Sequence, residues 1–164
     1  SKHESALSLV DGGDVNGLIN GLTATRPVVA LTDAGAATAI RSALTAAESG
    51  TIFTVPELTS GTQTLALPAP QVGLTYTFVT IDTADQIFNV ETDVSATKIL
   101  AVKPKGDGDN TAISQGYDKI GFKAAAVLGS MFSITCISTT AAVAWIAHDV
   151  IDGLEANTGS INLA

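Results

Sequence analysis

Short apolar stretches recur along this chain from Val28 onward, separated by glycine, proline and polar residues. Within most of them, large apolar residues alternate with threonine, serine or alanine, which is the period-two pattern of a strand buried on one face. Between Leu74 and Ile81, for example, Tyr76, Phe78 and Thr80 share one face. The pattern predicts strands over residues 28–32, 51–55, 62–67, 74–81, 86–90, 98–103, 117–123, 131–137 and 142–150.

Strands of about five to eight residues, with turn signals roughly every ten positions, are typical of sandwiches and barrels. We therefore expect an all-β fold, with an antiparallel β-sandwich or jelly-roll-like domain over residues 28–150 and a polar C-terminal tail over 151–164. The segment 34–48 stays open between helix and strand. Ile40 and Leu44 have helical spacing, but the same segment also alternates.

The first 27 residues differ from the rest of the chain. They contain the turn sequences Asp11-Gly12-Gly13-Asp14, Asn16-Gly17 and Asn20-Gly21, with few apolar residues between them. Such a segment cannot close a core of its own, so we expect a flexible arm over 1–27 that docks on another subunit or on a partner. The residues expected to anchor it are Leu7, Leu9, Val10, Leu18, Ile19 and Leu22.

A run of 24 residues without a charge, 124–147, is long enough to span a bilayer as a helix. Serines, threonines and Gly129 interrupt it, and it divides into two apolar runs around Ser138-Thr139-Thr140. The interpretation favoured here is a buried hairpin, with no contact to a membrane.

Composition limits the function classes. Asp and Glu number 16 against 8 Lys and Arg, which gives a net charge of −8, so the basic surface of a nucleic-acid-binding protein is not expected. Hydrophobic residues make up 46% of the chain, enough for a buried core. The only cysteine, Cys136, excludes an intrachain disulfide and cysteine-rich zinc sites.

The candidate catalytic residues are few. His148 lies beside Asp149 and Asp152, but there is no G-x-S-x-G motif and no basis for placing a serine next to His148. A metal site at these three residues is also not expected, because alternation along a strand places His148 and Asp149 on opposite faces. The predictions are therefore no catalytic residue, no metal, no cofactor and no enzymatic activity.

Three other patterns have structural interpretations. The acidic run 103–110 matches a calcium loop imperfectly, and a loop is expected there. The lysines between 98 and 123 are interleaved with acids, as on a solvated face. Tyr76, Phe78 and Trp145 alternate with small residues, which favours core packing over a sugar-stacking platform.

Four fragments occur in order along residues 44–150. They are Ala46-Ala47-Glu48-Ser49-Gly50, the strand end Leu67-Pro68, the strand Gly73-Leu74-Thr75-Tyr76-Thr77-Phe78, and a serine turn before Trp145. In this order the chain resembles small β-sandwich structural proteins of tailed bacteriophages, the capsid decoration (cement) and head-fibre class. The turn departs from the family's frequent Ser-Asp-Gly, since it reads Ser138-Thr139-Thr140-Ala141.

The resemblance implies a virion structural protein that decorates and stabilises the capsid lattice from the outside. Its implied partners are the major capsid protein and further copies of itself, in a homotrimer. The alternative is a receptor-binding or carbohydrate-binding module of a phage fibre. A small enzyme or nuclease-like domain is the third class considered, and no acid and base pair with defined spacing favours it.

Overall fold

The computed structural model describes residues 26–82, 86–92, 98–101, 116–124, 126–140, 142–151 and 161–163, the last of these by their backbone alone. The regular secondary structure of the described residues is almost entirely β-strand, with one short 3₁₀ helix, η1 (Ala46–Glu48). The expectation of an all-β fold is confirmed.

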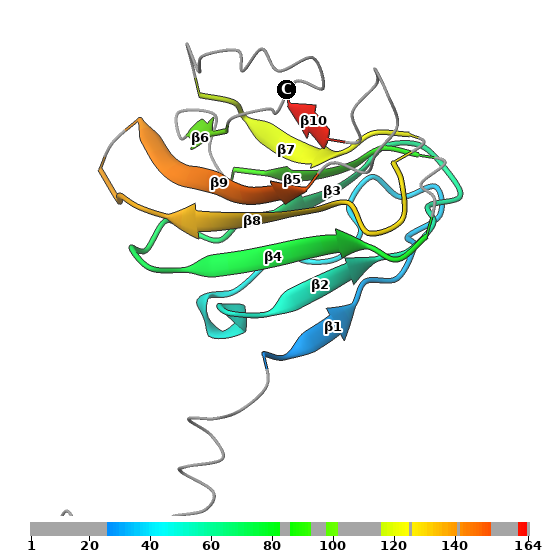
Figure 1. Ribbon diagram of the computed structural model, residues 1–164, viewed down its shortest axis with the longest axis horizontal. Helices are drawn as coiled ribbons and strands as arrows, with labels where there is room; N and C mark the ends of the chain where they lie inside the picture. Colours follow the sequence, from blue (N-terminus) through cyan, green and yellow to red (C-terminus); the bar gives the residue numbers. More distant parts are fainter. Residues whose placement is uncertain are drawn as a thin grey trace, which may run out of the picture.

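The strands form two sheets (Figure 1). Sheet A has the order β1-β2-β4-β8-β9-β6, and sheet B has the order β10-β7-β5-β3. Each of the nine predicted strand ranges overlaps one of β1 to β9, because the alternation of apolar and polar residues follows burial on one face. The bounds are β1 (Val28–Ala30), β2 (Ile52–Val55), β3 (Gln63–Ala66), β4 (Thr75–Thr80), β5 (Phe88–Glu91), β6 (Lys98–Leu100), β7 (Lys119–Phe122), β8 (Met131–Cys136), β9 (Val143–Ile151) and β10 (Ile161–Leu163).

Strand direction differs from the prediction. The pairs β1/β2, β2/β4, β3/β5 and β6/β9 are parallel, so both sheets are mixed rather than antiparallel. The pairs β4/β8 and β8/β9 at the centre of sheet A are antiparallel, as are β5/β7 and β7/β10 in sheet B. Alternation specifies which residues face the core, but it carries no information on strand direction.

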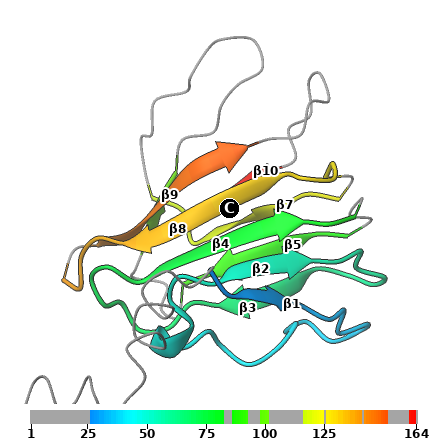
Figure 2. The same ribbon diagram turned by 60° about the horizontal axis from the view of Figure 1, so that its bottom comes forward.

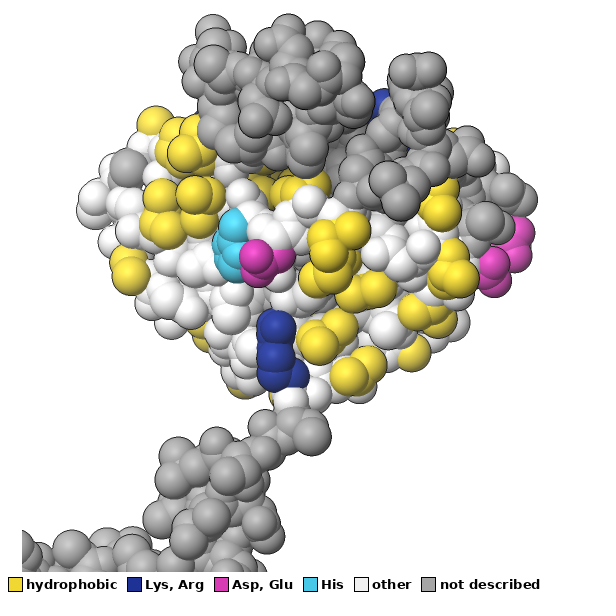
Figure 3. All heavy atoms as spheres, viewed as in Figure 1, with side chains coloured by type: hydrophobic (Ala, Val, Ile, Leu, Met, Phe, Trp, Pro, Cys, Tyr) yellow, Lys and Arg dark blue, Asp and Glu magenta, His cyan; other side chains and the backbone are white. Residues whose placement is uncertain are grey.

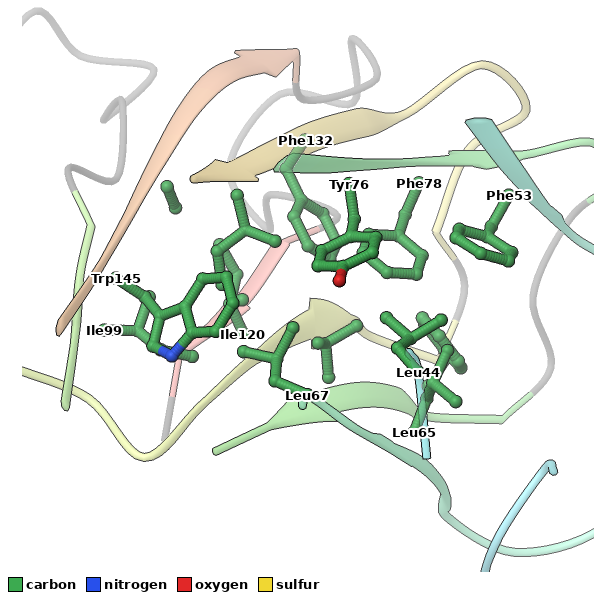
Figure 4. Close-up of a cluster of buried hydrophobic side chains, with 14 of the residues drawn as sticks. Leu44, Phe53, Leu65, Leu67, Tyr76, Phe78, Ile99, Ile120, Phe132 and Trp145 are labelled. Atoms are coloured by element: carbon green, nitrogen blue, oxygen red, sulfur yellow. The ribbon is translucent and has the colours of Figure 1, made fainter. Parts of the chain in front are cut away.

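The two sheets lie one over the other, and the core fills the space between them (Figures 1, 2 and 4). All five phenylalanines of the chain are fully buried there. Phe78 of β4 stacks on Phe53 and Phe132 of sheet A, with ring centroids 5.5 and 5.1 Å apart. Phe78 also lies 5.8 Å from Phe88 of sheet B, and Phe132 lies 5.2 Å from Phe122. The aromatic rings therefore connect the two sheets through the centre of the domain.

The ambiguous segment 34–48 is mostly neither helix nor strand. Residues 38–44 run along the free edge of β3, where Ile40 and Leu44 donate backbone hydrogen bonds to the carbonyls of Thr64 and Ala66, both at 2.9 Å. The side chains of Ile40 and Leu44 are buried in the core. Their spacing therefore reflects two contacts along an irregular segment, and the only helix in the region is η1.

A buried polar cluster fixes the start of this segment against β3. Gln63 is fully buried, and its side-chain amide donates to Asp33 Oδ1 and accepts a 3.1 Å hydrogen bond from the backbone of Ala34. Asp33 also accepts hydrogen bonds from the hydroxyl of Thr59 and the backbone of Gly35. Hydrogen bonds from Thr59, Gln63 and Gly35 lower the pKa of Asp33 to about 2. The cluster holds the loop in place and leaves no donor directed at a ligand.

The C-terminal tail contributes one strand, β10, where the sequence pattern predicts only a polar tail. β10 pairs with β7 antiparallel, with Asn162 opposite Gly121. Three residues at the end of a polar segment are too few for a period-two pattern to be read, so this strand is visible only in the assembled sheet.

Candidate functional site: the outer face of sheet A

Strand β8 runs through the middle of sheet A, and its alternate residues point away from the core. Met131, Ser133 and Thr135 lie on this side, between the outward residues of β4 and β9. The register places them in three cross-strand rows. The rows are Val79–Met131–Ile151, Thr77–Ser133–His148 and Thr75–Thr135–Ile146. We call this surface, together with Arg26, Ile52, Thr54 and Asp149, the outer face.

The polar side chains of the outer face bond mainly to one another. The hydroxyls of Thr77 and Ser133 are 2.8 Å apart, and Arg26 Nη2 donates to Thr77 Oγ1 at 2.8 Å. Arg26 Nε donates to the carbonyl of Gly50 at 3.0 Å, which fixes the guanidinium against the sheet. One end of the middle row is therefore a positive charge held in a defined position.

A second line of hydrogen bonds leads to a negative charge. Thr75 Oγ1 lies 2.9 Å from Thr135 Oγ1, and Thr135 Oγ1 lies 2.7 Å from His148 Nε2. The other ring nitrogen of His148, Nδ1, lies 2.9 Å from Asp149 Oδ2. The structure thus aligns a hydroxyl, an imidazole and a carboxylate, an arrangement that the sequence analysis did not expect.

The carboxylate of Asp149 reaches His148 because β9 contains a β-bulge. Ser133 pairs with His148, but Met131 pairs with Ile151, so β9 holds one extra residue here. Asp149 occupies this place with a φ of 50°. The bulge brings the Asp149 side chain to the same side as His148, so the prediction that these two residues point to opposite faces is wrong.

The line Asp149–His148–Thr135 has the order of groups in an acyl-transfer triad, but its surroundings are those of a sheet. Thr135 lies in β8, which pairs with β4 on one side and β9 on the other. The backbone amides of β8 donate hydrogen bonds to β4 and β9, whereas an acyl-transfer site needs amides that point together at the oxyanion of the intermediate. His148 and Asp149 are also well exposed, with side-chain relative accessibilities of 41% and 68%. The hydrogen bonds along this line fix the positions of the three side chains on the surface of the sheet.

Charge is sparse on the outer face (Figure 3). The strands β2, β4, β8 and β9 carry one acidic residue, Asp149, and one histidine, His148, and no lysine or arginine. Arg26 enters from the segment before β1. Around these groups lie half-buried or exposed apolar side chains, among them Ile151, which is 54% exposed. For a chain with a net charge of −8, this face is unusually close to neutral.

The aromatic residues do not form a binding platform. Tyr76, Phe78 and Trp145 are each at most 1% exposed, so the core interpretation is confirmed. Figure 4 shows all three directed into the space between the sheets. The Tyr76 hydroxyl donates to the carbonyl of Thr45 at 2.9 Å, and burial raises the pKa of Tyr76 to about 12.

Other predicted residues fall partly outside the described ranges. The anchoring residues, Leu7, Leu9, Val10, Leu18, Ile19 and Leu22, lie there, as do Asp152 and the acidic run 103–110. Where side chains are described, no group of three His, Cys, Asp or Glu residues is placed to hold a metal ion. The described lysines Lys98 and Lys119 form ion pairs with Asp118 and Glu91.

Residues 131–136 and 143–151 form adjacent antiparallel strands, as the hairpin interpretation of the uncharged run predicts. Within the described ranges, no helix is long and apolar enough to cross a membrane. No protein family model matches the chain, and no curated protein matches it in sequence.

Proposed function

We propose that this chain is a virion structural protein that decorates the outside of a capsid and stabilises its lattice. The observation that carries the proposal is the outer face of sheet A. It extends over β2, β4, β8 and β9 and is nearly uncharged, and the hydroxyls of Thr75, Thr77, Ser133 and Thr135 are hydrogen-bonded in pairs. Such a surface is suited to assembly, since a covering partner leaves few buried polar groups unsatisfied.

We also propose that the two sheets form a β-sandwich. The two facing sheets with one aromatic core form a β-sandwich of mixed strand direction, in place of the antiparallel sandwich or jelly roll that the strand pattern predicts. The aromatic core supports this, because Phe78 of sheet A packs against Phe53 and Phe132 of its own sheet and against Phe88 of sheet B. The sandwich then serves as a rigid body whose outer surfaces make the contacts.

The proposed partners are the major capsid protein and further copies of this chain, in the homotrimer that the resemblance implies. The proposed capsid anchor is the arm, through the apolar residues that the sequence analysis named. Several arms on one oligomer make later contacts intramolecular, so a modest single contact becomes a stable attachment. The proposal involves no catalytic step, cofactor, nucleic acid or membrane.

The test is co-sedimentation with capsids of the virus that encodes the chain. A variant without residues 1–22 should lose capsid retention, while its far-UV circular dichroism stays that of the full chain. A full-length variant with Leu9, Leu18 and Leu22 replaced by serine tests the same contact without shortening the chain. Retention of both variants at full occupancy would exclude the arm as the anchor.

A separate measurement addresses the alternative function. Full-length protein that binds no capsid but binds specific glycans on an array would contradict the decoration role and favour a receptor-binding module. Capsid binding without detectable glycan binding on the array supports the proposal.

A further inference from the structure

We infer that the outer face of sheet A binds the same face of a second copy of this chain, across a two-fold axis that runs along β8. The inference deepens the proposed function, on which it rests for treating this face as a contact surface. It commits to one occupant because of how charge and apolar residues are arranged about β8.

The middle row provides the first argument. Ser133 of β8 lies between Thr77 of β4 and His148 of β9. Arg26 is bonded at the Thr77 end of the row, and Asp149 is bonded at the His148 end. Adjacent strands are about 4.8 Å apart, so the positive and negative groups stand on opposite sides of β8.

A two-fold axis along β8 exchanges the two sides of this row. It places Arg26 of one copy opposite Asp149 of the other, and it does so twice in one contact. A two-fold axis that crosses β8 at a right angle in the plane of the face would instead set Arg26 against Arg26 and Asp149 against Asp149. The charge pattern is therefore complementary to itself under this one operation.

The apolar row provides the second argument. Met131 lies on β8, with Val79 on one side and Ile151 on the other. The same axis keeps each row opposite itself, so Met131 faces Met131 of the second copy, and Val79 faces Ile151 of the second copy. Apolar side chains thus meet apolar side chains along a whole row.

Desolvation provides the third argument. The hydroxyls of Thr75, Thr77, Ser133 and Thr135 already have partners at 2.8 to 2.9 Å within one copy. Covering them leaves no orphaned donor of the kind that opposes burial. Elsewhere the net charge of −8 makes two copies repel each other, so this nearly neutral face is the favoured place of approach.

The test measures association of the full chain in solution, without capsids, by sedimentation velocity over a range of concentrations. Wild type should form an assembly with an even number of copies, either a dimer or a hexamer in which the two-fold contact joins two homotrimers. Because no capsid is present, failure here leaves the capsid-binding test above unaffected. A monomer at all concentrations, or a trimer, would overturn the two-fold contact.

The first variant is Met131→Asp, which sets two carboxylates against each other at the axis. We expect the dissociation constant to rise by about tenfold or more, since like charges in an interface cost several kcal/mol. The matched control is Val72→Asp, in the turn before β4, where the side chain is 67% exposed. Equal association of both variants with wild type would contradict the inference, and thermal unfolding confirms that each is folded.

The second test exchanges the charges. Arg26→Glu alone and Asp149→Arg alone should each weaken association, because each creates two like-charge pairs across the axis. The double variant restores two opposite-charge pairs, so its association should return toward that of wild type. Additive weakening in the double variant would show that the two residues do not face each other, and would overturn the proposed axis.

Discussion

His148 and Asp149 are consecutive residues of a strand, yet both side chains lie on one side of sheet A, with Nδ1 and Oδ2 2.9 Å apart. The positive φ of Asp149 makes this possible. Asp and Asn adopt this left-handed conformation more readily than other residues with a side chain. A local backbone feature therefore decides where the single acid of the outer face is placed.

Substitution at Asp149 should separate its backbone role from its charge. Asp149→Asn keeps a residue that tolerates φ of 50°, and we expect its free energy of unfolding to stay within about 0.5 kcal/mol of wild type. Asp149→Val places a β-branched residue there and should cost about 1 to 3 kcal/mol. Urea denaturation of the two variants measures the difference, and equal stabilities would show that the bulge relaxes without cost.

Gly121 should tolerate no side chain. A Cβ atom on this residue of β7 would lie 1.8 Å from the carbonyl oxygen of Phe88 and 2.7 Å from Cα of Asn89. Since both are backbone atoms in the paired strand β5, Gly121→Ala should destabilise the fold by about 3 kcal/mol or more.

Gly61→Ala is the matched control for Gly121. Gly61 has a φ of 60° but open space around it, so alanine should cost only about 1 kcal/mol of backbone strain. Chemical denaturation of both variants gives the comparison. A Gly121→Ala variant as stable as Gly61→Ala would mean that β5 and β7 separate easily.

Asp33 should contribute to the acid sensitivity of the fold. Its pKa is lowered from 3.8 to about 2 by hydrogen bonds from Thr59, Gln63 and Gly35. A lowered pKa in the folded state stabilises the fold above the unfolded-state pKa, and this contribution is lost as pH falls from about 4 toward 2. Asp33→Asn should therefore be less stable than wild type at pH 6 but lose less stability over the acid range.

The measurement for Asp33 is the melting temperature of wild type and Asp33→Asn at intervals between pH 6 and pH 2. Convergence of the two curves at low pH supports the hydrogen-bonded carboxylate. Parallel curves would show that Asp33 does not titrate differently in the folded and unfolded chains.

Cys136 should react slowly with thiol reagents while the protein is folded. The residue is 1% exposed, and burial raises the pKa of its thiol, so little thiolate is present and little of it is accessible. Labelling by a maleimide, followed by mass spectrometry, should be slow in buffer and fast in denaturant. Fast labelling in buffer would indicate local opening at the end of β8.

The sequence predicts the positions of the strands well and their directions poorly. Residues such as Tyr76 and Phe78 show the alternation that burial requires, and they are buried. Nothing in that alternation tells β2 to pair with β4 in parallel, because direction depends on how the chain crosses between sheets.

Most of the candidate site could not be predicted from the sequence. Thr135 and His148 are 13 positions apart, and they meet because of the register between β8 and β9. The alternating threonines and serines of β4 and β8 signal an outward polar face, but the bulge at Asp149 and the place of Arg26 depend on the folded backbone.

Residues 38–44 also cover one edge of sheet B. They occupy the backbone of β3 on its outer side, through hydrogen bonds that include one from the Thr64 amide to the carbonyl of Thr38 at 2.7 Å. A strand of another molecule could pair with β3 only after it displaced these residues. Displacement would expose the side chains of Ile40 and Leu44, which are buried in the core. This border of sheet B is thereby protected from strand addition by another copy of the chain, even at high protein concentration.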